Sequence, residues 1–214
     1  MPTPQQFAET LTSIGISNNS HVIIYDSKNS SNAAARLWWM LKAMGHKKVQ
    51  VLNGGLAAAD RAGMSMTNEM SPVKKTEAYT FTNWQLPLAQ LSEVEKKAMD
   101  KNYLVIDVRD AYRYNGESEP IDLIAGHIPG AVNIPFTTNL DEHGLFLSPE
   151  ILRKKYEQEL HTIPAENIIV HCGSGVTACH SLLAMAYAGL PIPALYVGSW
   201  SEWSRNNKPI ACNS

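Results

Sequence analysis

The chain has 214 residues and a hydrophobic content of 44%, which suits one large or two small domains with a buried core and excludes disorder, collagen and coiled coils. Its 18 Lys and Arg residues balance 20 Asp and Glu residues, and a net charge of −2 without charge runs predicts no nucleic acid or membrane partner. No apolar run reaches the roughly 18–20 residues that cross a bilayer, and the segment after Met1 lacks the layout of a signal peptide. We therefore expect a cytoplasmic protein.

The cysteines are few and clustered. Cys172, Cys179 and Cys212 all lie in the last fifth of the chain, and none forms a CxxC pair of the kind found in zinc and redox sites. This pattern predicts a reducing compartment and one thiol that carries chemistry. We expect neither a metal nor another cofactor.

The first part of the chain alternates short apolar runs with amphipathic segments. The expected elements are a strand over residues 21–26, a helix over 33–44, a strand over 48–52 and a helix over 56–61. Trp38 and Trp39 fall on the first of these helices, and we expect both to be core aromatics rather than ligand contacts.

Residues 67–87 are polar, broken by prolines and without period, which predicts a linker between domains. Strands and helices alternate again after it. The expected elements are a helix from residue 91 capped by Ser92, a strand over 103–108, a turn into a short strand over 125–135, a helix over 149–160 capped by Ser148, a strand over 167–171, a helix over 177–189 and a strand over 194–198. This alternation predicts an α/β fold with a parallel sheet covered on both faces.

An internal repeat relates the two parts of the chain. Residues 22–26 align with 168–172 at an offset of 146, and Gly54-Gly55 aligns with Gly198-Ser199 at an offset of 144. About 57 residues of the first copy are absent when the copies are compared, which suggests a truncated form. We therefore expect a partial, non-catalytic copy over residues 1–66, the linker over 67–87 and a complete catalytic copy over 88–214.

The informative motif is Cys172-Gly173-Ser174-Gly175-Val176-Thr177-Ala178, directly after one expected strand and before one expected helix. Open α/β sheets bind ligands at the carboxyl ends of their strands. Two glycines let the backbone curl so that successive amides point at one anion, and the helix N-terminus adds partial positive charge. The motif thus favours a reactive Cys172 thiolate over a structural cysteine.

Two other functions fit the motif poorly. Cysteine-dependent phosphatases need an arginine six positions after the cysteine to clamp phosphate, and Ala178 stands there. A zinc site made of His171, Cys172, Cys179 and His180 would need adjacent ligands at both ends, unlike the usual spacing. Cys179 is expected to be a small core residue.

The loop motif, with Gly126-His127-Ile128-Pro129-Gly130 upstream and Trp200-Ser201-Glu202-Trp203 downstream, resembles the tandem-domain sulfurtransferases of the rhodanese superfamily. The loop is most similar to that of 3-mercaptopyruvate sulfurtransferases, whereas thiosulfate-preferring members usually have two cationic side chains at the second and third loop positions. The resemblance covers nearly the whole chain, with Asp26 in place of a cysteine in the first copy. It implies a rhodanese-like parallel sheet flanked by helices.

The resemblance implies a ping-pong reaction in which Cys172 takes sulfur from 3-mercaptopyruvate, releases pyruvate and passes the sulfur from its persulfide to a thiol or cyanide acceptor. A thioredoxin-like protein is one such acceptor. Arg113 matches the family arginine that binds the donor's anionic end. The cradle for the persulfide consists of Gly173, Ser174, Gly175, Val176 and Thr177.

The chain departs from the family after Glu119-Pro120, where Ile121 stands in place of a second arginine. Donor preference is therefore open, and a thiosulfate:cyanide sulfurtransferase is the alternative enzyme. A non-catalytic sulfur carrier or interaction module is the alternative from another class. Asp107 and Arg109 are expected to tie loops together, and His127 is expected to be a structural turn residue.

Overall fold

The computed structural model describes residues 1–213, and the chain divides into two compact units. Unit 1 is Met1–Leu86 and unit 2 begins at Pro87. The division falls at the end of the segment predicted as a linker. Among the described residues, no helix combines the length and the apolar composition that a bilayer span requires.

Unit 1 contains the predicted strands and helices and one further helix. Its elements in chain order are α1 (Pro4–Ser13), β1 (Val22–Ile24), α2 (Ala33–Ala43), β2 (Val49–Val51) and α3 (Gly55–Arg61). The strands β1 and β2 pair in parallel. The sequence prediction omitted α1, although Thr3 and Gln6 form a capping box around Pro4 at the first helical position.

Aromatic side chains contribute to the core of unit 1. Trp39 is fully buried and Trp38 is 5% exposed, so the prediction of core aromatics is confirmed. The ring of Trp84 lies 6.2 Å from that of Trp39, and Tyr79 stacks on His46 with centroids 5.8 Å apart. Part of the segment predicted as a linker therefore packs on unit 1.

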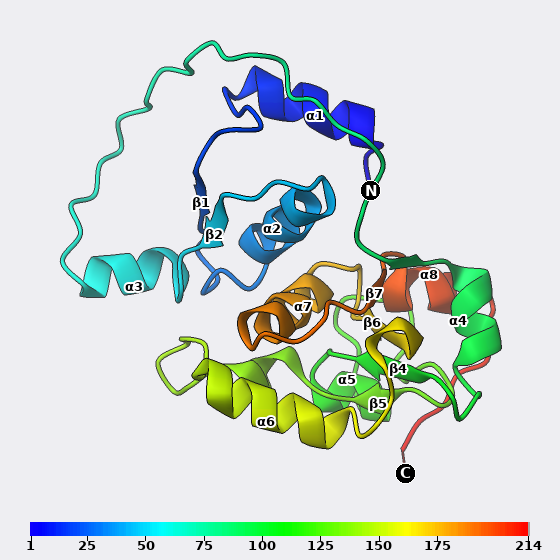
Figure 1. The fold of residues 1–214 in the computed structure, drawn as a ribbon. Coiled ribbons are helices and arrows are strands. Elements are labelled where there is room, and N and C mark those ends of the chain that lie inside the picture. Colours follow the sequence, from blue (N-terminus) through cyan, green and yellow to red (C-terminus); the bar gives the residue numbers. More distant parts are fainter. Residues whose placement is uncertain (214) are drawn as a thin grey trace. The chain divides into compact units, whose positions relative to one another are not determined.

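Unit 2 is a parallel sheet with helices, as predicted, and it has five strands, one more than the sequence predicted (Figure 1). Its elements are β3 (Leu88–Ala89), α4 (Leu91–Lys97), β4 (Leu104–Asp107), α5 (Ala111–Asn115), β5 (Val132–Asn133), η1 (Phe136–Asn139), α6 (Pro149–Glu159), η2 (Ala165–Asn167), β6 (Ile168–His171), α7 (Thr177–Tyr187), β7 (Ala194–Tyr196) and α8 (Ser199–Arg205). The strand order is β3-β7-β6-β4-β5, and every pair is parallel.

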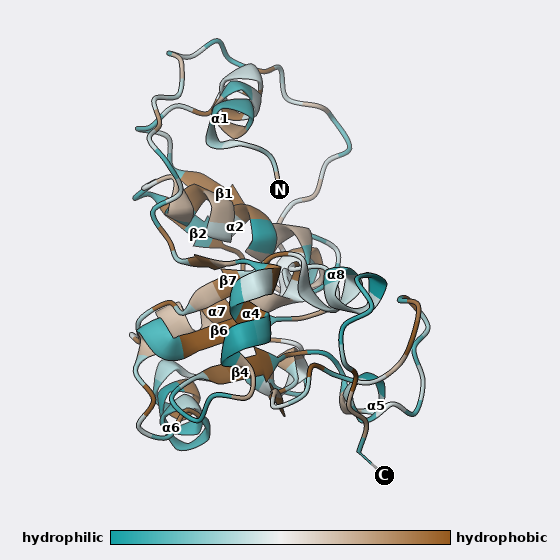
Figure 2. Ribbon diagram, turned by 90° about the vertical axis from the view of Figure 1, so that its right-hand side faces the viewer, coloured by the Kyte–Doolittle hydropathy of each residue, from teal (hydrophilic) through white to brown (hydrophobic). Residues whose placement is uncertain are grey.

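The central strands β4 and β6 are buried on both faces, and Figure 2 accordingly colours them brown. On one face Val105 and Ile169 pack with residues of α4, α5 and α8, including Val94, Tyr114 and Trp200. The alternate residues of each strand point to the opposite face, where α7 packs on β6 and on α6.

Two helix caps were predicted from the sequence, and the structure confirms one of them. Ser148 caps α6 by accepting a hydrogen bond from the Ile151 amide, with proline at the first position, as predicted. The prediction of Ser92 as the cap of α4 is wrong, because the helix begins at Leu91 and Ser92 lies within its first turn. The carboxylate of Glu93 accepts a hydrogen bond from the Gln90 amide at 3.0 Å, which makes Gln90 the cap.

The repeat seen in the sequence is a structural repeat. The order β1, α2, β2, α3 recurs as β6, α7, β7, α8, and α3 (Gly55–Arg61) aligns with α8 (Ser199–Arg205) at the offset of 144. The sequence prediction omitted α8, although the repeat and the predicted helix over 56–61 together imply it. The structure thus confirms tandem copies of one α/β unit.

Candidate active site

The predicted loop connects β6 to α7, at the carboxyl end of a central strand. Cys172 follows β6 directly and is 2% exposed. Gly175 has a φ of +71°, and a Cβ there would lie 2.6 Å from the carbonyl oxygen of Val197. Only glycine fits this position, so the motif's second glycine is required by the turn itself.

The start of α8 holds the loop from the neighbouring strand. The amide of Trp200 donates to the Cys172 carbonyl at 3.0 Å, and the amide of Ser201 donates to the Gly173 carbonyl at 2.9 Å. The Cys172 amide in turn donates to Oγ of Ser199 at 3.2 Å. Sequence reasoning gave these residues no role, although the resemblance had already drawn attention to the tryptophan motif.

Several backbone amides of the loop have no hydrogen-bond acceptor within the part of the chain that the structure describes. Within residues 1–213, the amides of Gly173, Ser174, Val176 and Thr177 donate no hydrogen bond to a protein acceptor. They sit between Cys172 and the first turn of α7, where the helix dipole favours negative charge. The arrangement can therefore receive an anion beside the thiol.

The equivalent loop of unit 1 contains a carboxylate that is bound by backbone amides. Asp26 stands at the position of Cys172, and its carboxylate accepts hydrogen bonds from four backbone amides. The donors are Lys28 at 2.7 Å, Ser30 at 2.9 Å, Asn32 at 3.2 Å and Ala34 at 3.0 Å. The strand–loop–helix unit of this repeat thus binds a carboxylate through its main chain.

A buried ionic network lies beside the loop, and Arg109 is its centre. Its guanidinium pairs with Asp107 at 2.6 Å and with Glu119 at 3.1 Å, and it donates to the carbonyl of Gly126 at 2.6 Å. It also lies 4.6 Å from the Trp200 ring. Arg109 therefore connects three segments, as predicted for the Asp107 and Arg109 element.

Arg113 lies against the loop but is already paired. Its guanidinium contacts Glu119 at 2.7 Å and Asp122 at 3.5 Å, and a Cβ on Gly173 would lie 3.5 Å from its Nη2. Burial alone would lower the pKa of Arg113, but the hydrogen bond and charge of Glu119 outweigh burial and raise it. Sequence reasoning identified Arg113 and missed both of its carboxylate partners.

Two histidines near the site have structural surroundings. His127 stacks on Tyr114 with ring centroids 3.7 Å apart and its Nδ1 lies 2.8 Å from the Tyr114 carbonyl oxygen, which agrees with the predicted structural role. His171 is fully buried, and its Nε2 lies 3.8 Å from Oδ2 of Asp107. Burial lowers the pKa of His171 despite the nearby carboxylate, so the ring is neutral at pH 7.

The remaining cysteines differ from Cys172 in their surroundings. Cys179 is fully buried within α7, and its Sγ donates to the Gly175 carbonyl at 3.3 Å, which confirms the predicted core residue. Cys212 is exposed near the end of the chain. Neither follows the end of a central strand.

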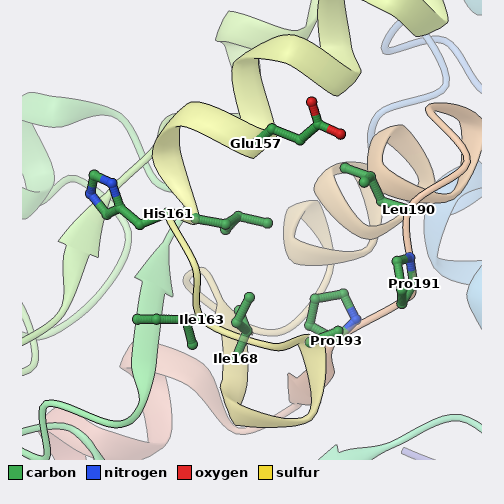
Figure 3. A pocket seen from close by; sticks show the side chains of 9 residues that line it. Glu157, His161, Ile163, Ile168, Leu190, Pro191 and Pro193 are labelled. Carbon is green, nitrogen blue, oxygen red and sulfur yellow. The ribbon is translucent and has the colours of Figure 1, made fainter.

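A separate pocket lies at the opposite end of β6 (Figure 3). It is lined mainly by apolar residues, among them Leu160, Ile163, Ile168, Leu190 and Pro193. Ile168 begins the strand that Cys172 follows, so roughly four residues of strand, about 13 Å, separate the pocket from the loop. The pocket is therefore distinct from the loop at Cys172.

Comparison with known proteins finds a rhodanese-like domain and sulfurtransferases. The family model of the rhodanese-like domain matches residues 1–62 and 90–206. A Pseudomonas aeruginosa protein described as a probable 3-mercaptopyruvate sulfurtransferase is 39% identical over 213 residues, covering 99% of this chain and 74% of that protein. The thiosulfate sulfurtransferase of Rattus norvegicus is 37% identical over 213 residues, covering 98% and 71%.

A solved structure gives the same result. The 3-mercaptopyruvate sulfurtransferase from Leishmania major superposes with a TM-score of 0.83 at 29% identity, over 98% of this chain. The match covers 58% of that protein, so this chain spans less than two thirds of its length.

Proposed function

Because the chain belongs to the rhodanese family and is a sulfurtransferase, we propose that Cys172 is its nucleophile and 3-mercaptopyruvate its sulfur donor. The observation that carries the proposal is the position of Cys172. The thiol follows a central parallel strand, beside loop amides that the described protein leaves unused. The carboxylate of Asp26 in the equivalent loop supports the view that this turn stabilises negative charge.

The proposed reaction has two steps. The Cys172 thiolate attacks the sulfur of 3-mercaptopyruvate, an S–S bond forms, and the C–S bond breaks with its electron pair passing to carbon. The resulting enolate takes up a proton and leaves as pyruvate. An acceptor thiolate or cyanide then attacks the outer sulfur of the persulfide, and the S–S bond breaks to return the Cys172 thiolate.

The loop has two tasks in this scheme. The amides from Gly173 to Thr177 stabilise the negative charge on the persulfide and on the departing group. Arg113, which lies beside Gly173, binds the donor's carboxylate. The acceptor is a small thiol, cyanide or a thioredoxin-like protein.

The donor preference follows from what the loop lacks. Gly173 and Ser174 carry no charge, so the loop itself offers a dianion such as thiosulfate only main-chain donors. A monoanionic mercapto-acid fits this arrangement better. Thiosulfate remains the second candidate donor because a relative at 37% identity is named for it.

The two copies have different tasks in this proposal. Residues 88–214 form the catalytic domain, and residues 1–66 form a partial copy in which Asp26 replaces the thiol, joined by residues 67–87. The absence of CxxC pairs among the three cysteines suits the reducing cytoplasm, where we place the protein.

The experiment that tests the function measures pyruvate release under steady-state conditions with 3-mercaptopyruvate and cyanide, beside thiocyanate formation with thiosulfate and cyanide. A larger kcat/KM for 3-mercaptopyruvate supports the proposal. A larger value for thiosulfate would favour the alternative enzyme. Persulfide formation without turnover would favour a sulfur carrier.

A further inference from the structure

The ionic network beside the loop has an excess of buried carboxylates. Asp107, Glu119 and Asp122 have side chains 0–2% exposed and face the guanidinium groups of Arg109 and Arg113, at 1% and 9% exposure. Arg205 also reaches Asp122, at 3.5 Å, but its side chain is 49% exposed and therefore screened by water. The buried part of the network thus carries a net charge of −1 when its carboxylates are ionised.

The two carboxylates on Arg113 contact different parts of its guanidinium. Glu119 receives hydrogen bonds from Nε, and its Oε1 lies 2.7 Å from Nη2. Asp122 reaches only Nη2, at 3.5 Å, and no carboxylate among residues 1–213 engages Nη1. The terminal Nη1 and Nη2 edge is therefore the edge left for an incoming carboxylate, and Asp122 lies at it.

Asp122 also lies next to the loop. A Cβ on Gly173 would be 3.5 Å from Oδ2 of Asp122 and 3.5 Å from Nη2 of Arg113. The carboxylate is held in place by Ser201, which donates to Oδ1 at 2.5 Å from α8. An anionic donor that reaches Arg113 beside Cys172 therefore meets the negative charge of Asp122.

We propose that Asp122 is a specificity-determining residue, whose carboxylate competes with the donor for Arg113 and penalises a dianionic donor more than a monoanionic one. The proposal rests on the sulfurtransferase function proposed above and deepens it. Repulsion scales with the charge of the donor, so the penalty in free energy is about twice as large for thiosulfate as for 3-mercaptopyruvate. Selectivity thus comes from a fixed anion as well as from the uncharged loop.

The test is Asp122→Asn, which removes the charge and keeps an oxygen that accepts from Ser201. For the sulfur-loading half-reaction we expect kcat/KM to rise roughly 3- to 10-fold with 3-mercaptopyruvate, less than for a close charged hydrogen bond because 3.5 Å is long. With thiosulfate the rise is about the square of that factor, roughly 10- to 100-fold. Asp122→Ser is the second variant if the first folds poorly. Glu142→Gln is the control, since it removes one charge from a side chain that is 86% exposed.

A binding measurement separates this proposal from the function on which it rests. Pyruvate is a carboxylate that needs no catalysis, and calorimetry should give a Kd about 3- to 10-fold lower for Asp122→Asn than for the unmodified protein, with Glu142→Gln unchanged. An equal or weaker affinity in Asp122→Asn, or equal rises for both donors, would overturn the role of Asp122. If Asp122→Asn binds pyruvate more tightly but neither the unmodified protein nor any variant transfers sulfur, the role of Asp122 is supported and the proposed function is refuted.

Discussion

Asp26 and Cys172 occupy the same position in the two copies of the repeat, between a parallel strand and the loop that leads into the next helix. Cys172 follows β6 directly, and Asp26 lies two residues after the end of β1. The Asp26 carboxylate accepts four backbone hydrogen bonds, whereas Cys172 lies beside amides that the described protein does not use. One turn geometry thus serves a fixed anion in the first copy and, in our proposal, a transient anion in the second.

The role of Cys172 predicts that Cys172→Ser abolishes sulfur transfer while the fold is kept, since a hydroxyl cannot form a persulfide. Cys179→Ser should retain most activity because Cys179 lies inside α7 as a core residue. Mass spectrometry after incubation with the donor should show 32 Da added to the unmodified protein and to Cys179→Ser alone. Loss of activity in Cys179→Ser would show that the assignment of Cys172 as the nucleophile is wrong.

The role of Asp26 predicts an effect on stability and not on sulfur chemistry. Asp26→Ala leaves four amides without their carboxylate, and the loss of such hydrogen bonds to a half-buried charge costs about 2–3 kcal/mol. Urea unfolding should show unit 1 destabilised by about that amount. Asp60→Ala, which changes an exposed aspartate of α3, is the control and should stay within about 0.5 kcal/mol of the unmodified protein.

The uncharged loop predicts that added cations change donor preference. Replacing Gly173 with Arg and Ser174 with Lys should raise kcat/KM for thiosulfate relative to 3-mercaptopyruvate. A Cβ at Gly173 would lie at ordinary van der Waals distance, 3.5 Å, from Nη2 of Arg113 and Oδ2 of Asp122, so the first side-chain carbon is accommodated there. Equal kcat/KM for both donors in the unmodified protein would contradict the assigned preference.

The role of Arg113 is tested by separating the half-reactions. Losing a charge-assisted hydrogen bond costs about 1.5–3 kcal/mol, so Arg113→Ala should lower kcat/KM for sulfur loading from 3-mercaptopyruvate by roughly 10- to 150-fold. Transfer from a pre-formed persulfide to cyanide should remain nearly normal. An unchanged loading step would make Arg113 a bystander.

That substitution needs a stability control, because it leaves Glu119 and Asp122 buried without this partner. Arg113→Lys keeps a charge but not the planar fork, so it should retain more stability and still load sulfur more slowly. Thermal unfolding of both variants distinguishes loss of the fold from loss of the donor contact.

Lys155 on α6 predicts a pH dependence of stability. Its Nζ donates to Asn139 at 2.9 Å and contacts Thr138, and burial lowers the pKa of Lys155 to about 8 although Glu159 raises it. Between about pH 8 and the ordinary lysine pKa of about 10.4, the unfolded chain binds more protons than the native one. Stability therefore rises with pH across that window, by at most about 1.4 kcal/mol per pH unit.

The variant that checks this is Lys155→Met, which should remove that contribution to the rise in unfolding free energy between pH 8 and 10. Lys154→Met, at the exposed neighbouring position, should follow the unmodified protein. Identical pH profiles for the unmodified protein and Lys155→Met would show that the amine titrates normally.

The α/β class, the repeat, the central strands and the loop after Cys172 could all be predicted from the sequence. These features depend on local signals: runs of apolar residues mark buried strands, and a cysteine followed by two glycines marks a strand-to-helix turn. The sequence also contains signals for α1 and α8, although neither helix was predicted. The signal for α1 is its capping box, and the signal for α8 is its alignment with α3 in the repeat. Ser92 does not cap α4 because the capping box of Gln90 and Glu93 starts the helix at Leu91, which places Ser92 inside the first turn.

The pairing of charged side chains, in contrast, depends on how distant segments pack. Arg113, Glu119 and Asp122 lie within ten residues of one another, yet no periodicity indicates that both carboxylates fold onto one guanidinium beside Gly173. That contact depends on Ser201 and Trp200, about 80 residues later, whose helix holds both the loop and the 120–125 segment. Pairing of charges is set by the packing of distant segments, which is why sequence reasoning identified the arginine and missed the aspartate that competes for it.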